Sequence, residues 1–458
     1  MDFQIVVFFI LANALNLCRI NSMGYILDAL DSSSPCPIYL TISPISQNVE
    51  NSHMEVNWGP KCPNPAEWIG LYPEDPSVSY SAPLFTIDLD NKTTGHVKTH
   101  VKLGDIQLPY GWDRNDAADS PPDHIKSACL PFYIASFNGK KIQTLDCLKI
   151  QPNWMKSMPE IQNVPLKDLF IPGTHCSGCY DRRTKASRSI LLKKFGFVQN
   201  FDIWTQLVFG VRYLDISVGH KDPKNETNSP SNLWIVNENL YVAPLLPLLE
   251  EIRLFVKLSK EVVIMNFIEF PIGFYNNPER HLVLLRTLAA EFGDIIFTRP
   301  WDSTASSGDL TLEMMDRTGK NLLILYNDKS VIEDSQLIWP IWRKFTTVNL
   351  QSSELHDYIR EIFSRKNEYT PKNEPWVIYG IQGVDASYSP GLHLPASRER
   401  ANAINKVFTD LISNAWAANA NVVAFDFFMS CNLIELAIGI NFQKHFNNTN
   451  YLILDIDE

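Results

Sequence analysis

The strongest constraint on the fold of this chain is a change of rhythm near residue 150. Before it, short runs of alternating apolar and polar residues are separated by Pro and Gly, a pattern typical of an antiparallel β-sandwich. After a linker at residues 150–153, strand-like runs alternate with amphipathic helical runs, which indicates βα units around a parallel sheet. We therefore predict a β-sandwich domain over residues 30–150 and an α/β TIM-type (β/α)8 barrel over residues 155–458.

In the first domain the pattern predicts five strands, and the pair Asn138-Gly139 is typical of a hairpin turn. The expected strands are Ile38–Ile42, Met54–Trp58, Trp68–Tyr72, Val97–Val101 and Phe132–Phe137. Two roles remain open for this domain, a binding or orienting module and a structural companion of the second domain.

In the second domain about eight strand-like runs in roughly 300 residues fit a barrel. The expected strands are Leu169–Ile171, Arg212–Val218, Leu233–Val236, Glu261–Phe270, Asn321–Tyr326, Trp376–Val384, Val422–Phe428 and Tyr451–Ile456. A doubly wound sheet is the alternative, but it would need a phosphate-binding Gly-rich turn, and the chain holds no GxGxxG or GxxxxGKS/T motif. The barrel is therefore the prediction, and its chemistry is expected just past the carboxyl ends of the strands.

Composition argues against two kinds of partner. The chain has 458 residues, of which 45% are hydrophobic and 20% charged, and its formal net charge is −11. Binding to nucleic acid requires a basic face, and docking on anionic lipid requires clusters of Lys and Arg. We therefore expect no nucleic-acid partner, whereas the sequence leaves the oligomeric state open.

The amino terminus carries the apolar run Ile5–Leu15, which is too short to span a bilayer and suits the h-region of a secretory signal. The run lacks the usual preceding basic residues, so a buried amino-terminal segment is the alternative. We predict a signal peptide over residues 1–22, a secreted protein and no transmembrane segment, because no later run reaches about 20 apolar residues. Three glycosylation sequons agree with export, at Asn91, Asn225 and Asn447.

The cysteines divide into two sets. The first set, suited to two disulfides with three possible pairings, is Cys36, Cys62, Cys129 and Cys147. The second set is Cys176, Cys179 and Cys431, for which we predict one disulfide and one spare thiol. Zinc or redox chemistry at the Cys-x-x-Cys pair is the alternative.

The stretch IPGTHCSG, from Ile171 to Gly178, turns sharply after an apolar run and leaves His175 at the carboxyl end of a predicted strand. It resembles the PGTHDSG signature of the phosphatidylinositol-specific phospholipase C X-domain family, in which the His is catalytic. GVRYLDIS at residues 210–217 resembles the family's GVRYLDIR, and NVVAFDFFMSCN at residues 421–432 resembles its last functional strand. The resemblance covers roughly residues 155–457 and implies phosphoric diester hydrolysis.

The strand ends and the resemblance together indicate the site residues. We predict His175 and Asp215 as catalytic residues. The predicted substrate-binding residues are Arg212, Asn237, Glu238 and Asp426. Asn237 or Glu238 stands where the family has its second His, and a structural pairing of Asp426 with a neighbouring backbone or with Arg212 is the alternative for Asp426.

The resemblance also implies a mechanism. In the family, the inositol 2-hydroxyl attacks phosphorus and expels diacylglycerol, while one His removes the hydroxyl proton and a second protonates the leaving oxygen. A cation, Arg or Ca²⁺, stabilises charge on the nonbridging oxygens. Here Cys176 and Ser217 replace charge-stabilising residue types, and Ca²⁺, which needs about six to eight oxygen ligands, is poorly supplied. We therefore expect no cofactor, and an inositol phospholipid or inositol phosphate head group as the ligand.

Two functions follow from these observations. The first is an altered phosphodiesterase that uses His175 with Asp215. The second is a catalytically inactive pseudoenzyme that binds a lipid head group or a protein partner. Loss of the second His and of the charge-stabilising residue favours the pseudoenzyme, whereas the family resemblance favours a phosphoric diester hydrolase.

Overall fold

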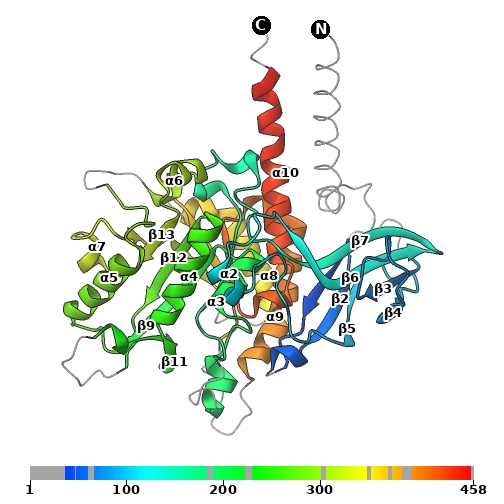
Figure 1. Cartoon of the computed structure of the whole chain (residues 1–458), viewed down its shortest axis with the longest axis horizontal. Helices are drawn as coiled ribbons and strands as arrows, with labels where there is room; N and C mark the ends of the chain where they lie inside the picture. Colours follow the sequence, from blue (N-terminus) through cyan, green and yellow to red (C-terminus); the bar gives the residue numbers. More distant parts are fainter. Residues whose placement is uncertain are drawn as a thin grey trace. The chain divides into compact units, whose positions relative to one another are not determined.

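The computed structural model describes residues 37–46, 48–59, 66–182, 189–221, 229–300, 306–347, 352–369, 374–383 and 395–454 (Figure 1). The chain divides into two compact units that interleave along the sequence. Unit 1 comprises Met1–Thr41, His53–Val101 and Cys129–Leu148, and unit 2 comprises Ile42–Ser52, Lys102–Ala128 and Lys149–Glu458. The predicted signal peptide lies outside the described residues.

Unit 1 holds two small sheets, with strand orders β1-β2-β5 and β4-β3-β6-β7. The strands are β1 (Ile38–Ile42), β2 (His53–Trp58), β3 (Trp68–Tyr72), β4 (Phe85–Asp88), β5 (Gly95–Lys102), β6 (Ala128–Asn138) and β7 (Lys141–Ile150). All five predicted strands are confirmed, and Asn138-Gly139 lies at the turn between β6 and β7. The sandwich arrangement of the two sheets stays a prediction.

The sheet around β3 is held by aromatic packing and a disulfide. Trp68 stacks on Phe137 with ring centroids 4.0 Å apart, and a disulfide between Cys129 and Cys147 joins β6 to β7. The other two cysteines of the first set lie outside the described residues. Asn91 is exposed in the turn between β4 and β5, a position that a glycan can reach.

Unit 2 is built around a parallel sheet with the order β14-β13-β12-β9-β8-β17-β16-β15. Its strands are β8 (Ile171–Thr174), β9 (Tyr213–His220), β12 (Val263–Glu269), β13 (Leu322–Tyr326), β14 (Trp339–Pro340), β15 (Arg343–Thr346), β16 (Trp376–Gly380) and β17 (Val422–Phe425). The two ends of the order, β14 and β15, are separated in the chain only by Ile341 and Trp342. The sheet therefore curls until its ends meet in one segment.

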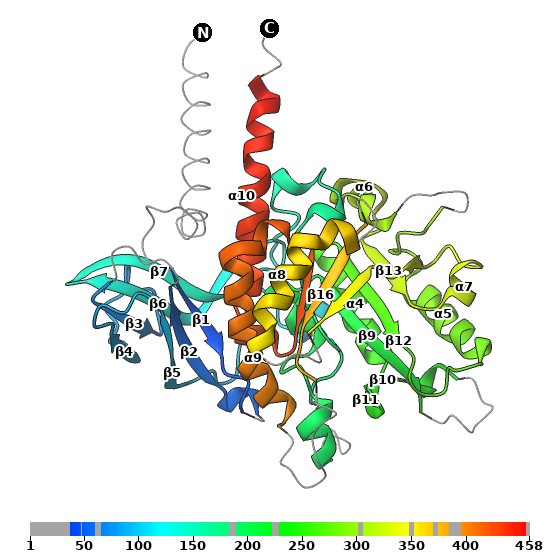
Figure 2. The same cartoon turned by 180° about the vertical axis from the view of Figure 1, so that it is seen from behind.

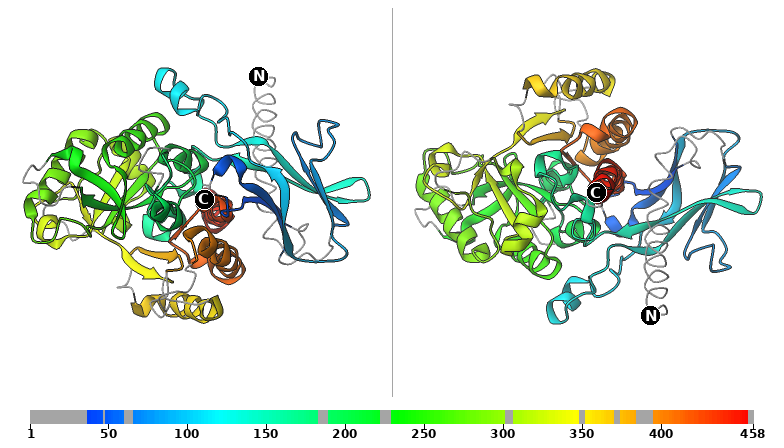
Figure 3. Two further views of the ribbon diagram at one scale, coloured as in Figure 1. Left: turned by 90° about the horizontal axis from the view of Figure 1, so that it is seen from below. Right: turned by 90° about the horizontal axis from the view of Figure 1, so that it is seen from above.

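The burial of the strands is typical of a parallel sheet whose faces are covered. Every residue of β13 and β17 is buried, as expected for strands that are covered on both faces. The α-helices are α2 (Arg114–Asp119), α3 (Ile203–Phe209), α4 (Leu246–Ser259), α5 (Pro278–Phe292), α6 (Leu312–Thr318), α7 (Lys329–Ile332), α8 (Ser352–Tyr369), α9 (Ser397–Leu411) and α10 (Leu433–Leu454). Helix α9 packs on β16 and on α8 (Figure 2), while α4 packs on α3 and α5. Figure 3 views α10, in red, nearly along its axis.

Two predicted barrel strands are wrong. Leu233–Val236 is a strand, β10 (Leu233–Asn237), but it pairs antiparallel with β9 and with β11 (Leu240–Pro244). A parallel pair requires a crossover, usually a helix, whereas this chain returns directly beside β9. The run Tyr451–Ile456 lies in α10 as far as Leu454, because the preceding helix continues through residues of high strand propensity.

Among the residues that the structure describes, no helix is long and apolar enough to cross a membrane.

Candidate active site

His175 and Asp426 form a hydrogen-bonded pair at the carboxyl ends of two neighbouring strands. Strands β8 and β17 pair with Thr174 opposite Phe425, so the next residue of each strand stands beside the other. His175 Nδ1 lies 2.7 Å from Asp426 Oδ1, and the imidazole stays 23% exposed while the carboxylate is 8% exposed. Because Nδ1 is engaged, Nε2 is the nitrogen left to exchange a proton with a ligand.

Asp215 lies beside this pair and is buried. It stands on β9 opposite Asn266 of β12. Its Oδ1 accepts hydrogen bonds from the Tyr379 hydroxyl at 2.9 Å and from Asn266 Nδ2 at 3.2 Å, and its Oδ2 accepts from the Cys176 N–H at 3.3 Å. Both carboxylate oxygens of Asp215 thus have protein donors. Asp215 is therefore placed to hold Tyr379, Asn266 and the main chain of Cys176 together, and its charge acts on His175.

Sequence reasoning missed three residues of the site, Asn266, which donates to Asp215, and Tyr379 and Lys344. The ring of Tyr379 meets His175 edge-on, with ring centroids 6.0 Å apart. Lys344 Nζ lies 5.3 Å from the Tyr379 ring centroid and 3.3 Å from Glu269 Oε1. Tyr379 falls in a predicted strand and was open to detection, whereas no strand was predicted for the polar run around Lys344. We call the following six residues the mouth: His175, Asp215, Asn266, Lys344, Tyr379 and Asp426.

The charges of the mouth act on one another. Burial lowers the pKa of His175, but the carboxylates of Asp426 and Asp215 outweigh burial and raise this pKa above its usual value, while Lys344 acts to lower it. Burial raises the pKa of Asp215 despite the opposing effects of His175 and Lys344. The imidazole therefore sits in a field that favours its protonated form.

The backbone is left-handed at two non-glycine residues that directly follow the His–Asp pair. Cys176 has φ 37° and Phe427 has φ 49°. Such conformations cost non-glycine residues on the order of 1–3 kcal/mol and concentrate at functional sites. The strain thus lies beside the two residues whose side chains form the pair.

The structure places Arg212 outside the mouth. Its side chain is fully buried, and its Nε donates to Glu261 at 2.9 Å. The guanidinium also donates to the main-chain oxygens of Leu207, Val211 and Pro152. This geometry gives Arg212 a structural role and does not support its predicted contact with substrate. Nor does it pair with Asp426, the alternative that the sequence left open.

Asn237 and Glu238 lie at the tip of the β10–β11 hairpin. The Asn237 Nδ2 donates to the main-chain oxygens of Phe195 and Gly196, both at 3.2 Å. The negative charges of Asp426 and Glu238 both act to raise the pKa of the Arg400 guanidinium. Of the two, only Glu238 is therefore coupled to a group that the mouth also influences.

The cysteines of unit 2 form one disulfide and leave one thiol, as predicted. Cys176 is bonded to Cys179, and Cys431 is free and buried, which raises the pKa of its thiol to about 12. In the part of the chain that is described, no group of three His, Cys, Asp or Glu side chains could hold a metal ion. The mouth holds two carboxylates, Asp215 and Asp426, whereas Ca²⁺ takes about six to eight oxygen ligands, so this donor set is a poor fit for Ca²⁺.

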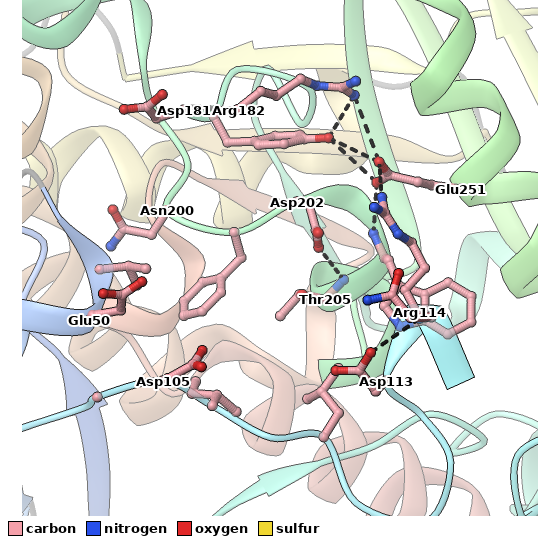
Figure 4. A pocket seen from close by; sticks show the side chains of 18 residues that line it. Glu50, Asp105, Asp113, Arg114, Asp181, Arg182, Asn200, Asp202, Thr205 and Glu251 are labelled. Atoms are coloured by element: carbon pink, nitrogen blue, oxygen red, sulfur yellow. Dashed lines mark hydrogen bonds and ion pairs between the residues drawn. The ribbon is translucent and has the colours of Figure 1, made fainter. Parts of the chain in front are cut away.

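A polar pocket of unit 2, of about 490 Å³, surrounds Glu251 of α4 (Figure 4). Glu251 accepts a hydrogen bond from Arg114 at 2.8 Å, and burial, helped by Asp202, raises its pKa to about 7. Six carboxylates and two arginines line the pocket, and no residue of the mouth does. An excess of carboxylates disfavours a phosphate, so the mouth is the better candidate for phosphoric diester chemistry.

Fold and mouth together define an α/β protein whose polar site stands at the carboxyl ends of a curled parallel sheet.

No family profile matches the chain. PI-PLC X domain-containing protein 1 of Mus musculus is 27% identical over 212 residues, which cover 42% of this chain and 57% of the relative. Its Homo sapiens counterpart is 26% identical over 219 residues, which cover 43% and 63%. PI-PLC X domain-containing protein 2 of Homo sapiens is 33% identical over 87 residues, covering 15% and 28%.

The chain thus spans less than two thirds of the length of the first two of these relatives. Among solved structures, a mutant phosphatidylinositol-specific phospholipase C from Staphylococcus aureus is 14% identical with a TM-score of 0.44, covering 63% of this chain and 97% of that one. The similarity to the PI-PLC X domain-containing proteins confirms the family resemblance predicted from the motifs.

Proposed function

We propose that the mouth binds the phosphoric diester head group of an inositol phospholipid and that His175 is its general base. The His175–Asp426 pair carries the proposal, because a carboxylate at 2.7 Å fixes the ring and leaves Nε2 for the ligand. Similarity to proteins named for a phospholipase C domain supports the substrate class. In this proposal the curled sheet is the TIM-type barrel of that family.

In the proposed reaction, His175 Nε2 takes the proton of an inositol hydroxyl. The hydroxyl oxygen forms its bond to phosphorus while the bond from phosphorus to the glycerol oxygen breaks, and that leaving oxygen takes up a proton from a water molecule, because no side chain of the mouth is assigned as the acid. Asp426 stabilises the imidazolium that forms, and Lys344 is the cation assigned to the nonbridging oxygens, since its charge already acts on His175. No step passes through Ca²⁺.

An inactive head-group binder is the second candidate, and Asn237 is the observation in its favour. The resemblance places the second His at Asn237 or at Glu238, and the amide of Asn237 is engaged by two main-chain oxygens. An amide does not exchange protons near neutral pH, so protonation of the leaving oxygen is the weak step. We therefore expect turnover to be slow relative to head-group binding.

The proposed location is extracellular. The two disulfides in the described part of the chain are typical of an oxidising compartment. Exposure of Asn91 is compatible with glycosylation there. Asn225 and the side chain of Asn447 lie outside the described residues.

The test uses purified full-length protein with vesicles of phosphatidylinositol or glycosyl-phosphatidylinositol, with and without Ca²⁺. Release of diacylglycerol should fall about 10²–10⁴-fold in His175→Ala, while calorimetry follows the binding of inositol phosphate. Absence of turnover in every condition with binding retained would select the inactive binder. Absence of both would sink the head-group assignment.

A further inference from the structure

The loop that carries His175 is closed by a disulfide between two buried residues, Cys176 and Cys179. A disulfide constrains the unfolded chain more when it closes a longer loop. This bond spans a sequence separation of 3, against 18 for Cys129–Cys147. Its larger effect is therefore expected on the local geometry of the loop, beside a left-handed residue that needs support.

The geometry of the loop connects the disulfide with the catalytic pair. The Cys176 oxygen accepts from the Cys179 N–H at 2.8 Å, and the Cys179 oxygen accepts from the N–H groups of Val198 and Gln199 at 2.9 and 3.1 Å. The Val198 oxygen in turn accepts from the Phe427 N–H at 2.8 Å. The disulfide-closed turn is thus hydrogen-bonded to the segment that touches the residue after Asp426.

The side chain of Gln199 completes this connection. It is fully buried, and its Nε2 donates to the main-chain oxygens of His175 and of Phe425, both at 2.9 Å. The first oxygen belongs to His175 itself, directly after β8, and the second belongs to Phe425, the last residue of β17 and the neighbour of Asp426. A single amide therefore fixes the spacing between the two loops.

We propose that Cys176, Cys179 and Gln199, which we call the brace, are positioning residues that hold His175 against Asp426. The brace acts on the imidazole through the main chain and touches no substrate. This inference rests on the proposed function for its effect on turnover, but its effect on the imidazole is measurable without any substrate. It assigns the residue after His175, which departs from the family signature, a role in keeping the base in place.

The experiment compares the wild type with two brace variants, Gln199→Met and Cys176→Ala/Cys179→Ala, so that failure of one to fold leaves the other. The pKa of His175 is measured by NMR on histidine-labelled protein, with the resonance assigned by its loss in His175→Ala. In each brace variant the imidazole should lose part of its contact with Asp426, and its pKa should fall toward the ordinary value. Turnover should drop about 10- to 100-fold, since a displacement near 1 Å can cost about 10²-fold.

Two control variants separate positioning from general destabilisation. Asn441 is also a fully buried amide, and it bonds both main-chain groups of Phe170 at the other end of β8, at 2.8 and 2.7 Å. Asn441→Leu and Cys129→Ala/Cys147→Ala should lower the unfolding midpoint and leave the pKa of His175 unchanged. An equal fall of that pKa in the controls, or an unchanged pKa in both brace variants, overturns the brace. A fall confined to the brace variants in a protein without turnover supports the brace and rejects the proposed enzyme.

Discussion

Two charged pairs of unit 2 differ in what their surroundings leave free. Arg212 and Glu261 are both 0% exposed, and the guanidinium donates to main-chain oxygens as well as to the carboxylate. His175 and Asp426 have a single short contact, and the imidazole keeps 23% of its surface. Charge and burial alone therefore do not identify a functional site. The second pair differs from the first because its partly exposed ring keeps one nitrogen, Nε2 of His175, available to a ligand.

The largest effect is expected from breaking the fully buried pair of Arg212 and Glu261. Arg212→Met leaves the Glu261 carboxylate buried without its partner, which should cost about 3–5 kcal/mol of unfolding free energy. Denaturant unfolding measures this loss. As a control, Lys156→Met removes one side of an exposed pair with Asp316, roughly half exposed on both sides, and should cost at most about 1 kcal/mol. A loss as small for Arg212→Met would contradict the structural role of the pair.

Glu251 sharpens the comparison, because it is buried and paired with Arg114 yet titrates near neutrality. Its pKa in the folded protein is raised from 4.5 to about 7, mainly by burial. The folded state thus binds this proton more tightly than the unfolded state. Its contribution to stability is fully present below pH 4.5 and is lost as pH rises through about 7.

Glu251→Gln should therefore remove roughly 3 kcal/mol of pH dependence from the unfolding free energy over this window. Unfolding curves at several pH values measure the difference between variant and wild type. Parallel pH curves for the two proteins would show that Glu251 has the same pKa in the folded and the unfolded states. As a control, Asp309→Asn removes one side of the ion pair between Lys167 and the half-exposed Asp309, and should lower the unfolding free energy by at most about 1 kcal/mol.

Asp426→Asn tests the partly exposed pair of His175 and Asp426 directly. The carboxylate raises the pKa of His175, so its replacement should lower that pKa and move the acid limb of kcat/KM to lower pH. Turnover should fall at least about 10²-fold, because the imidazolium loses its counter-charge. NMR titration follows the pKa whether or not the protein turns over. An unmoved pKa would mean that the 2.7 Å contact is not formed in solution.

Much of the sheet could be predicted from the sequence, because β9, β12, β13, β16 and β17 are mostly apolar and almost entirely buried. Strands β14 and β15 could not, since one has two residues and the other is largely polar. The failure carried over to the site, because Lys344 lies on β15. Because β15 was not predicted, Lys344, the one lysine or arginine of the mouth, was not predicted either.

The site residues divide in the same way. His175 and Asp426 were each predicted from a motif, but their contact depends on the register of β8 with β17, which no local pattern encodes. The structural role of Arg212 depends on Glu261, 49 residues later in the chain. A sequence pattern can predict which residues stand at the ends of strands. Which of these side chains contact one another depends on how the strands pair in the folded sheet.

Lys344→Met gives the smallest expected effect and the sharpest sign. Lys344 lowers the pKa of His175, whereas Asp426 raises it. Its removal should therefore raise the pKa of His175, opposite to the shift in Asp426→Asn, and weaken inositol phosphate binding about tenfold. Lys344→Arg keeps the charge and should restore both quantities, and added salt should weaken binding in the wild type more than in Lys344→Met. If binding is unchanged in Lys344→Met while the pKa rises, the lysine acts on the imidazole but does not contact the phosphate, and its proposed role at the nonbridging oxygens is wrong.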